Sequence, residues 1–308
     1  MSRRRRPDSG AAGALIVDKP AGCTSHDVVD QVRRALGTRK VGHAGTLDPD
    51  ATGVLVLGVG PGTKLLNYVT GVDKGYWGRI RFGTETSTLD AGGEVTATHT
   101  MTVSADEVAA TAKTMVGPGL QVPPMVSAVR VGGRRLHELA REGTEVERPP
   151  RPITVHRFDT SPTEDPLVYE VNVVCSSGTY VRSLAADLGT ALGGGAHLAA
   201  LRRISVGPFT LDDACDLDDL ALRPLRELVA HLPAIVIGAD DVRAIGHGQG
   251  VAIERSVRIE APRPAPGSPE PTGVAPFAVC DTNDTLVAIA TLDDGRLVPE
   301  RVLIGVDR

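Results

Sequence analysis

Two short runs of apolar residues limit most strongly what this chain can fold into. The segments GALIV (13–17) and GVLVLGVG (53–60) contain no charged side chain, which is typical of buried strands. Two later segments, 75–83 and 167–178, alternate apolar and polar residues and predict further strands, as does PITVHRFDT at 152–160. The chain is therefore expected to contain a substantial sheet.

Helical patterns separate these strands at irregular intervals. Residues 24–37 offer N-cap candidates in Thr24 and Ser25, apolar residues at helical spacing, and a stop at Gly37. The other predicted helices are 63–69, 104–117 (with capping-box spacing) and 134–143, followed by 179–193. Because helices and strands alternate irregularly and some strand pairs resemble hairpins, we expect an α+β fold with a mixed sheet rather than a βαβ repeat.

Composition divides the chain into three parts. Residues 1–10 contain four consecutive arginines and are expected to be a disordered basic tail. Residues 11–233 hold the elements above and predict one large domain. Residues 234–308 contain short strand patterns with tight turns and predict a small β-rich domain. Six prolines at 261–276 predict a flexible surface insertion in it.

The charge distribution allows a polyanionic partner. The net charge is −5, but residues 1–203 carry 24 Lys and Arg against 21 Asp and Glu, whereas residues 204–308 carry 9 against 17. A nucleic acid would have to bind the first part, where basic residues would have to cluster.

Cysteine usage and hydropathy indicate where such a protein works. The four cysteines are scattered without a CxxC pair, which argues against a zinc knuckle or a disulfide framework and fits a reducing cytosol. The apolar run after the basic start is too short for a signal peptide, and no run approaches the ~18–20 residues of a membrane span. We expect a cytoplasmic protein that does not contact a membrane.

The stretch GHAGTLDPDATG (42–53) concentrates an imidazole and two carboxylates in a glycine-rich loop. Its DPDAT fits the D-x-D-x-T motif of phosphatases that form a phosphoaspartate intermediate. In those enzymes an apolar strand precedes the motif, whereas in this chain the apolar strand comes after it. HAGTLD fits the H-x4-D dyad of glycerolipid acyltransferases, which usually carry apolar membrane-inserting segments that this chain lacks. Spacing alone favours a plain connecting turn with solvated aspartates.

A longer string decides among these readings. Residues 40–64 resemble the catalytic loop of bacterial tRNA pseudouridine synthases of the TruB type, whose signature is close to GHxGTLDPxATGVL. Further blocks resemble that family in the same order, and the resemblance covers about residues 13–210. These blocks are LIVDKPAGCTSHDVV, DKGYWGRIRFGTETSTLDAGGEV, QVPPMVSAVRVGGRRLHELAREG, CSSGTYVRSLAADLG and GGGAHLAALRRISVGPF.

The resemblance implies a fold and a reaction. The fold is a mixed, largely antiparallel central sheet flanked by helices in a catalytic domain at 11–233, with a PUA-like domain at 234–308. The reaction converts the T-loop uridine of tRNA (position 55) to pseudouridine: the C1′–N1 bond breaks, the base turns, and C5 joins C1′. No atoms are gained or lost, so neither a cofactor nor a metal is expected. The expected partner is the tRNA T arm, and we expect a monomer.

The resemblance also assigns roles to residues. Asp48 is the catalytic carboxylate, acting as nucleophile or base. Arg182 is its partner, expected to hold the pKa of Asp48 down and to orient it. Tyr76 is expected to stack on the flipped-out base and to be placed to handle the C5 proton, and Tyr180 to line the pocket beside Arg182. Leu201 would supply an apolar wall.

Three further expectations concern the neighbourhood of the loop. His43 is expected to face the RNA and to assist base flipping. Lys19 is expected to support the catalytic loop, with an RNA contact as the less favoured alternative. The glycines Gly42, Gly45 and Gly53 are expected to let the RNA backbone approach.

The chain departs from the family pattern at several positions. Asp50 stands where an apolar residue is more frequent and adds a charge beside Asp48. Val126 and His137 each replace a commoner Tyr, and Ser177 replaces a frequent Lys. A non-catalytic RNA-binding or RNA-folding module is the main alternative function. It would use the same cleft without needing an aspartate, so the presence of Asp48, together with Tyr76 and Arg182, favours the enzyme.

Overall fold

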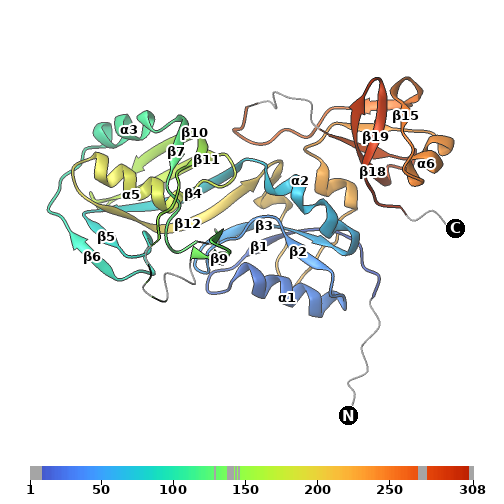
Figure 1. The fold of residues 1–308 in the computed structure, drawn as a ribbon. Helices are drawn as coiled ribbons and strands as arrows, with labels where there is room; N and C mark the ends of the chain where they lie inside the picture. Colours follow the sequence, from blue (N-terminus) through green and yellow to red (C-terminus); the bar gives the residue numbers. More distant parts are fainter. Residues whose placement is uncertain are drawn as a thin grey trace, which may run out of the picture.

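The computed structural model, which describes residues 9–127, 130–136, 142, 144, 146–269 and 276–304, contains two large sheets (Figure 1). The first has nine strands in the order β1-β3-β12-β4-β11-β10-β7, with β2 paired to β3 and β13 paired to β12. Its strands are β1 (Gly13–Lys19), β2 (Val41–His43), β3 (Thr52–Val59), β4 (Lys74–Phe82), β7 (Gly117–Gln121), β10 (Arg151–Pro162), β11 (Val168–Cys175), β12 (Ala196–Val206) and β13 (Phe209–Thr210).

The second sheet has six strands in the order β15-β19-β18-β17-β14-β16. They are β14 (Ala234–Val236), β15 (Val251–Ala252), β16 (Arg258–Glu260), β17 (Phe277–Cys280), β18 (Leu286–Asp293) and β19 (Arg296–Val302). Two hairpins complete the strands: β5 (Thr84–Thr86) with β6 (Val95–Thr98), and β8 (Arg130–Val131) with β9 (Arg134–Arg135). The α-helices are α1 (Ser25–Leu36), α2 (Leu66–Thr70), α3 (Ala105–Thr114), α5 (Val181–Ala191) and α6 (Ala239–Gly246).

The first sheet is mixed and largely antiparallel, as predicted. Its pairings are antiparallel except that of β12 with β3, which is parallel. The sequence patterns did not identify β12. This strand begins at Ala196, directly after the glycines 193–195 of the quoted block GGGAHLAALRRISVGPF. The register of β12 against β4 sets Arg203 opposite Tyr76 and Leu201 opposite Gly78, which brings two of the quoted blocks of the sequence together.

Local sequence signals explain the helix boundaries. Thr24 caps α1 in a capping box with Asp27, and Gly37 ends it in the left-handed region at φ 64°. Ser104 and Glu107 form the predicted capping box of α3. The helix predicted at 134–143 lies mostly outside the described residues. Among the described helices, none is long and apolar enough to cross a membrane.

Helices cover the first sheet in two groups (Figure 1). Val28, Val29 and Val32 of helix α1 pack against one face of β1 and β3. That face is formed by alternate residues of the two strands, such as Leu15 and Leu55. Helices α3 and α5 pack on the part of the sheet formed by β4, β10 and β11. The N-terminus of α5 therefore points toward the middle of the sheet, where the site described below lies.

The β-rich C-terminal part is confirmed, and it shares a core with the first sheet. Val54 and Val56 from β3 belong to the same buried cluster as Leu228 and as Ala278 and Ile289 of the second sheet. Burial of apolar surface common to both sheets opposes their separation.

Two predicted segments lie partly outside the described residues. Of the basic tail, residues 1–8 are not described; of the proline-rich insertion, 270–275 are not. The described part of the insertion is attached to the first domain. The backbone N–H of Arg263 donates to the carbonyl of Ala230 at 2.7 Å, and its guanidinium binds Asp213 at 2.7 Å.

Candidate active site

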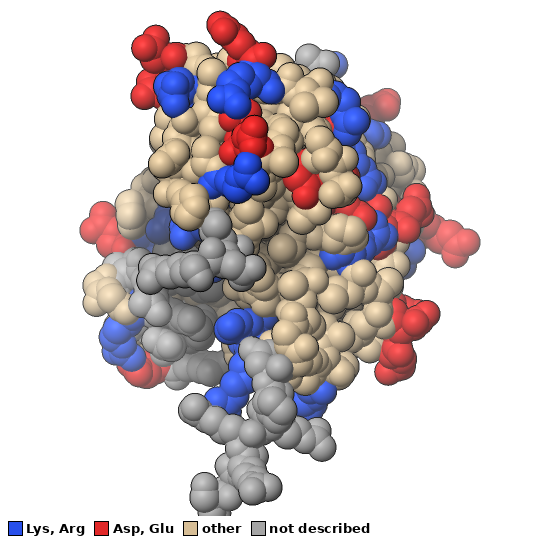
Figure 2. Space-filling model, turned by 90° about the vertical axis from the view of Figure 1, so that its right-hand side faces the viewer, with Lys and Arg blue, Asp and Glu red and all other residues tan. Residues whose placement is uncertain are grey.

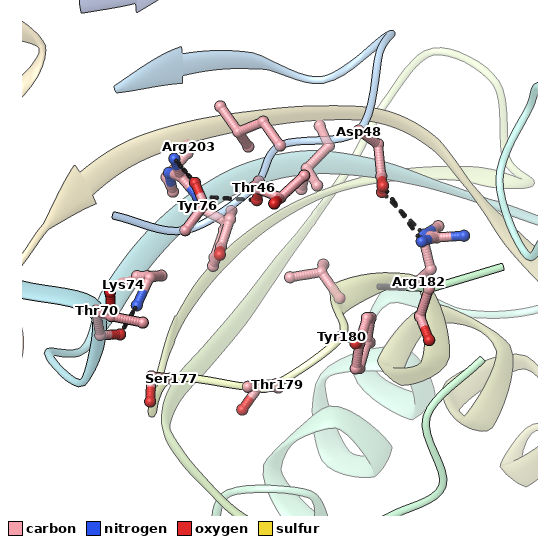
Figure 3. A pocket seen from close by; sticks show the side chains of 16 residues that line it. Thr46, Asp48, Thr70, Lys74, Tyr76, Ser177, Thr179, Tyr180, Arg182 and Arg203 are labelled. Carbon is pink, nitrogen blue, oxygen red and sulfur yellow. Dashed lines mark hydrogen bonds and ion pairs between the residues drawn. The ribbon is translucent and has the colours of Figure 1, made fainter. Parts of the chain in front are cut away.

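A cavity of about 400 Å³ lies where the 45–48 loop, β4, β12 and the N-terminus of α5 meet. We refer to it as the central cavity (Figure 3). It is lined by Gly45, Thr46, Leu47, Asp48, Thr70, Lys74, Tyr76, Ser127, Ser177, Gly178, Thr179, Tyr180, Val181, Arg182, Leu201 and Arg203. A concave site with a few converging charged groups is the usual form of a ligand-binding site.

Asp48 and Arg182 form an ion pair in this cavity, as predicted. The guanidinium Nε lies 3.0 Å from Asp48 Oδ2, and Nη2 donates to Oδ1 at 3.4 Å. The Arg182 side chain is 5% exposed and that of Asp48 44% exposed. The carboxylate is thus held from one side by a buried cation and is open to the cavity on the other.

Arg182 is itself held by two further loops. Its Nη1 donates to the carbonyl of Thr88 and its Nη2 to that of Val126, each at 2.9 Å. Nη1 also lies 3.4 Å from Oδ2 of Asp90. Sequence reasoning missed Asp90, although the residue lies within the quoted block STLDAGG. The carbonyl of Val126 makes this contact whatever side chain the residue carries.

The expected effect of Arg182 on the pKa of Asp48 is only partly right. Burial raises the pKa of Asp48, and the guanidinium of Arg182 lowers it, but the effect of burial is larger. Asp90 and Asp50 raise this pKa further. Arg182 therefore lowers the pKa of Asp48 as expected, but burial leaves the net pKa above the ordinary aspartate value.

Tyr76 lies beside Arg203 in the cavity floor. β4 carries Tyr76 opposite Arg203 of β12, and burial raises the pKa of the phenol to about 12. The Arg203 side chain, 1% exposed, donates to the carbonyls of Val54, Thr46 and Gly45 at 2.7, 3.3 and 3.1 Å. Arg203 therefore ties the catalytic loop to the sheet. Arg203 lies in the quoted block GGGAHLAALRRISVGPF, but the sequence alone assigned no role to it.

Tyr180 and Leu201 also line the cavity, as predicted. Tyr180 is the N-cap residue of α5, and its backbone is fixed by Gln121, whose amide oxygen accepts from the Tyr180 N–H at 2.7 Å. Both side chains are partly exposed, so the cavity has apolar and aromatic walls that a ligand can reach.

Lys19 supports the catalytic loop rather than facing the cavity. The residue is 0% exposed, and its ammonium donates to the carbonyls of Pro20, Cys23 and Pro49 at 2.9, 2.6 and 2.9 Å. All three N–H donors are occupied, which excludes the RNA contact in this conformation. Ser25 adds a second support, because its hydroxyl accepts from the N–H of Leu47 at 2.8 Å.

His43 and the loop glycines do not match their predicted roles equally well. His43 lies in β2, outside the set of residues that line the cavity, and burial lowers its pKa. Gly53 (φ 102°) faces the protein, since a Cβ there would lie 2.1 Å from the carbonyl oxygen of Arg203. A Cβ at Gly42 would lie 2.9 Å from Leu66. Packing within the chain, not approach of RNA, therefore accounts for these two glycines.

Lys74 is a further cavity residue, and the sequence patterns gave it no role. It lies two residues before Tyr76 on the same face of β4 and is 7% exposed. Its ammonium donates to the carbonyls of Thr70 and Val72 at 3.0 and 2.8 Å. Burial, together with the nearby Arg203, lowers the pKa of Lys74 to about 8.

Charged groups outside the central cavity also bear on whether the described part of the chain could hold a metal ion. In the upper part of Figure 2, Lys and Arg side chains are interspersed with Asp and Glu. Ion pairs of the C-terminal part include Arg243–Asp240 and Arg258–Glu260. In the part of the chain that the structure describes, no group of three or more His, Cys, Asp or Glu is placed to hold a metal ion.

Comparisons with known proteins agree with this geometry. Residues 33–181 match the TruB family pseudouridylate synthase (N terminal domain), and residues 182–231 match the tRNA pseudouridylate synthase B C-terminal domain. The chain is 51% identical over 262 residues to tRNA pseudouridine synthase B of Rhodococcus jostii, covering 81% of this chain and 86% of the relative. The corresponding protein of Paenarthrobacter aurescens is 46% identical, with 90% of each chain covered.

A solved structure extends the likeness to the fold. A chain in the crystal structure of a Cbf5-Nop10-Gar1 complex superposes with a TM-score of 0.73 at 25% identity, covering 97% of this chain and 88% of that one. The coverage includes both sheets described above. With the family match over residues 33–231 and the high identity to curated relatives, the conclusion is direct: this chain belongs to the TruB family of pseudouridylate synthases.

Proposed function

We propose that the chain is a tRNA pseudouridine synthase that isomerises the T-loop uridine at position 55. The single observation that carries the proposal is the Asp48–Arg182 pair, at 3.0 Å, inside a cavity that also holds Tyr76 and Leu201. The relatives named above are tRNA pseudouridine synthases, which supports tRNA as the substrate.

The arrangement suits an isomerisation that proceeds on a flipped-out base. The target uridine leaves the folded T loop and stacks on Tyr76, with Leu201 against its other side and Tyr180 at the rim. Asp48, held by Arg182, then acts on the nucleotide while the C1′–N1 bond breaks and C5 joins C1′. Tyr76 has a pKa of about 12 and stays a neutral phenol, so it acts as a stacking platform and a hydrogen-bond donor.

Other parts of the chain have supporting roles in this proposal. Lys19 keeps the loop of Asp48 in place from behind, and His43, at the end of β2, is proposed to contact the RNA outside the central cavity. Residues 11–233 form the catalytic domain, and residues 234–308 a PUA-like domain. The enzyme works as a cytoplasmic monomer without a cofactor or metal.

The experiment that tests the proposal is chemical mapping of pseudouridine in unmodified tRNA incubated with the chain in the presence of EDTA. We expect one new pseudouridine, in the T loop. A mapped site elsewhere would contradict the proposed substrate position. Binding of the tRNA without any pseudouridine would favour the alternative, an RNA-binding or RNA-folding module.

A further inference from the structure

Two buried cations lie side by side in the floor of the central cavity. Lys74 and Arg203 are 7% and 1% exposed. A Cβ built on Gly45 would lie 3.4 Å from Cε of Lys74 and 3.7 Å from Nη1 of Arg203, so both side chains approach the same point. They lie across the cavity from Asp48 and Arg182 in Figure 3.

Neither cation is neutralised by the protein around it. Within the described residues, their hydrogen bonds go to backbone carbonyls and, for Arg203, also to the neutral phenol of Tyr76, and no carboxylate forms an ion pair with either. Asp73, the acid next to Lys74 in sequence, is paired with His156 at 3.0 Å instead. Burial of a charge without a counter-charge is costly, so it points to a bound negative group that completes the site.

The ammonium of Lys74 is the better placed of the two to meet such a group. Carbonyls of Thr70 and Val72 take two of its three N–H donors, which leaves one donor without a partner among the described residues. The face of β4 that carries Lys74 into the cavity also carries Tyr76, the proposed platform for the base. Arg203 is committed to the loop carbonyls, and it contributes a fixed positive charge behind Tyr76.

Resting on the function proposed above, we propose that Lys74 is a catalytic residue that stabilises the negative charge of the detached uracil. When the C1′–N1 bond breaks, its electron pair stays on the base, which becomes a uracil anion with charge on N1 and the two carbonyl oxygens. Lys74 donates its remaining N–H to this anion, and the charge of Arg203 adds to the stabilisation. After rotation, an electron pair of the anion forms the C5–C1′ bond, C5 loses its proton and N1 gains one, so the composition is unchanged.

The pKa of Lys74, lowered to about 8 by burial, is consistent with this role. At neutral pH the ammonium is still mostly charged, yet it has lost most of its hydration. A buried ammonium held in place in this way stabilises a developing anion more than a hydrated ammonium does, because no solvent has to reorganise around it.

The test measures pseudouridine formation in a T-arm minihelix under single-turnover conditions with the full chain. We compare wild type with Lys74→Met and Lys74→Arg, and with Lys113→Met as a control at an exposed lysine of α3. For Lys74→Met we expect the rate at saturating RNA to fall about 100-fold, as for loss of one preorganised donor. The Kd for the minihelix should stay within about twofold, Lys74→Arg should recover part of the rate, and Lys113→Met should match wild type.

A minihelix with 5-fluorouridine at the target position separates this role from a structural one. Fluorine withdraws electrons and makes the base a better anion, so the defect of Lys74→Met in cleavage of the C1′–N1 bond should shrink. An equal defect on both substrates would overturn the proposal. Weaker binding (a higher Kd) with a normal rate at saturating RNA would also overturn it, because that result would indicate a phosphate contact. If Lys74→Met does not fold, Lys74→Gln, a neutral donor, replaces it. A wild-type chain that forms no pseudouridine would refute the proposed function instead.

Discussion

His231 should make the fold sensitive to mild acid. Its Nε2 is 2.9 Å from the carbonyl of Tyr68, so the neutral ring donates from this nitrogen, while Nδ1 is buried with no hydrogen-bond partner in the described chain. A proton on Nδ1 would enter a site without an acceptor, and burial accordingly lowers the pKa of His231 to about 4.

The sign and size of the effect follow from this pKa. In the unfolded chain the imidazole takes a proton near pH 6.5, whereas in the folded chain it does so near pH 4. Between these values the unfolded state binds more protons, so the free energy of unfolding falls as the pH falls. At 1.36 kcal/mol per pH unit, the loss from pH 6.5 to 4 is about 3 kcal/mol.

Urea unfolding followed by circular dichroism at pH 7, 5.5 and 4 measures this loss. His231→Gln keeps a donor for the Tyr68 carbonyl but does not titrate, so it should lose about 3 kcal/mol less than wild type over this range. His247→Gln, at an exposed histidine, is the matched control and should behave as wild type does. Equal losses for wild type and His231→Gln would refute the reasoning.

Three further substitutions test the support of the catalytic loop. Gly53→Ala should lower the free energy of unfolding by about 3 kcal/mol in urea titrations, because its Cβ would meet the Arg203 carbonyl at a positive φ; a loss under 0.5 kcal/mol would contradict this packing. Lys19→Met leaves three loop carbonyls without their donor, and we expect about 3 kcal/mol lower stability and a slower single turnover at unchanged Kd for RNA. Arg182→Met removes the group that lowers the pKa of Asp48, so the acid limb of the pH–rate profile should shift to higher pH; an unmoved limb would show that Asp48 does not govern it.

The sequence predicted the elements whose signals are local. N-cap candidates and a glycine stop located α1, capping-box spacing located α3, and runs of apolar or alternating residues located β1, β3, β4 and β11. The central strand β12 was missed because HLAALRRISV shows neither pattern: its buried Arg203 interrupts the apolar face while serving the loop.

The site was predicted where it consists of side chains in recognisable blocks, and not where it depends on long-range contacts. Asp48, Tyr76 and Arg182 come together as expected. Asp90 and Lys74 could not be assigned, because their roles arise from distances to Arg182 and from desolvation in the folded cavity. The lowering of the Asp48 pKa by Arg182 was expected, but the larger effect of burial that raises it was not, since the extent of burial cannot be read from sequence.

The most direct test of the account is the Asp48→Asn substitution assayed on a T-arm minihelix. The amide keeps the size of the side chain and a hydrogen-bond acceptor for Arg182, but it cannot act as a nucleophile or base. We predict that pseudouridine formation disappears while the Kd for the minihelix stays close to that of wild type. Pseudouridine formation at a rate near wild type, or a loss of binding that accounts for the whole loss of activity, would contradict Asp48 as the catalytic carboxylate.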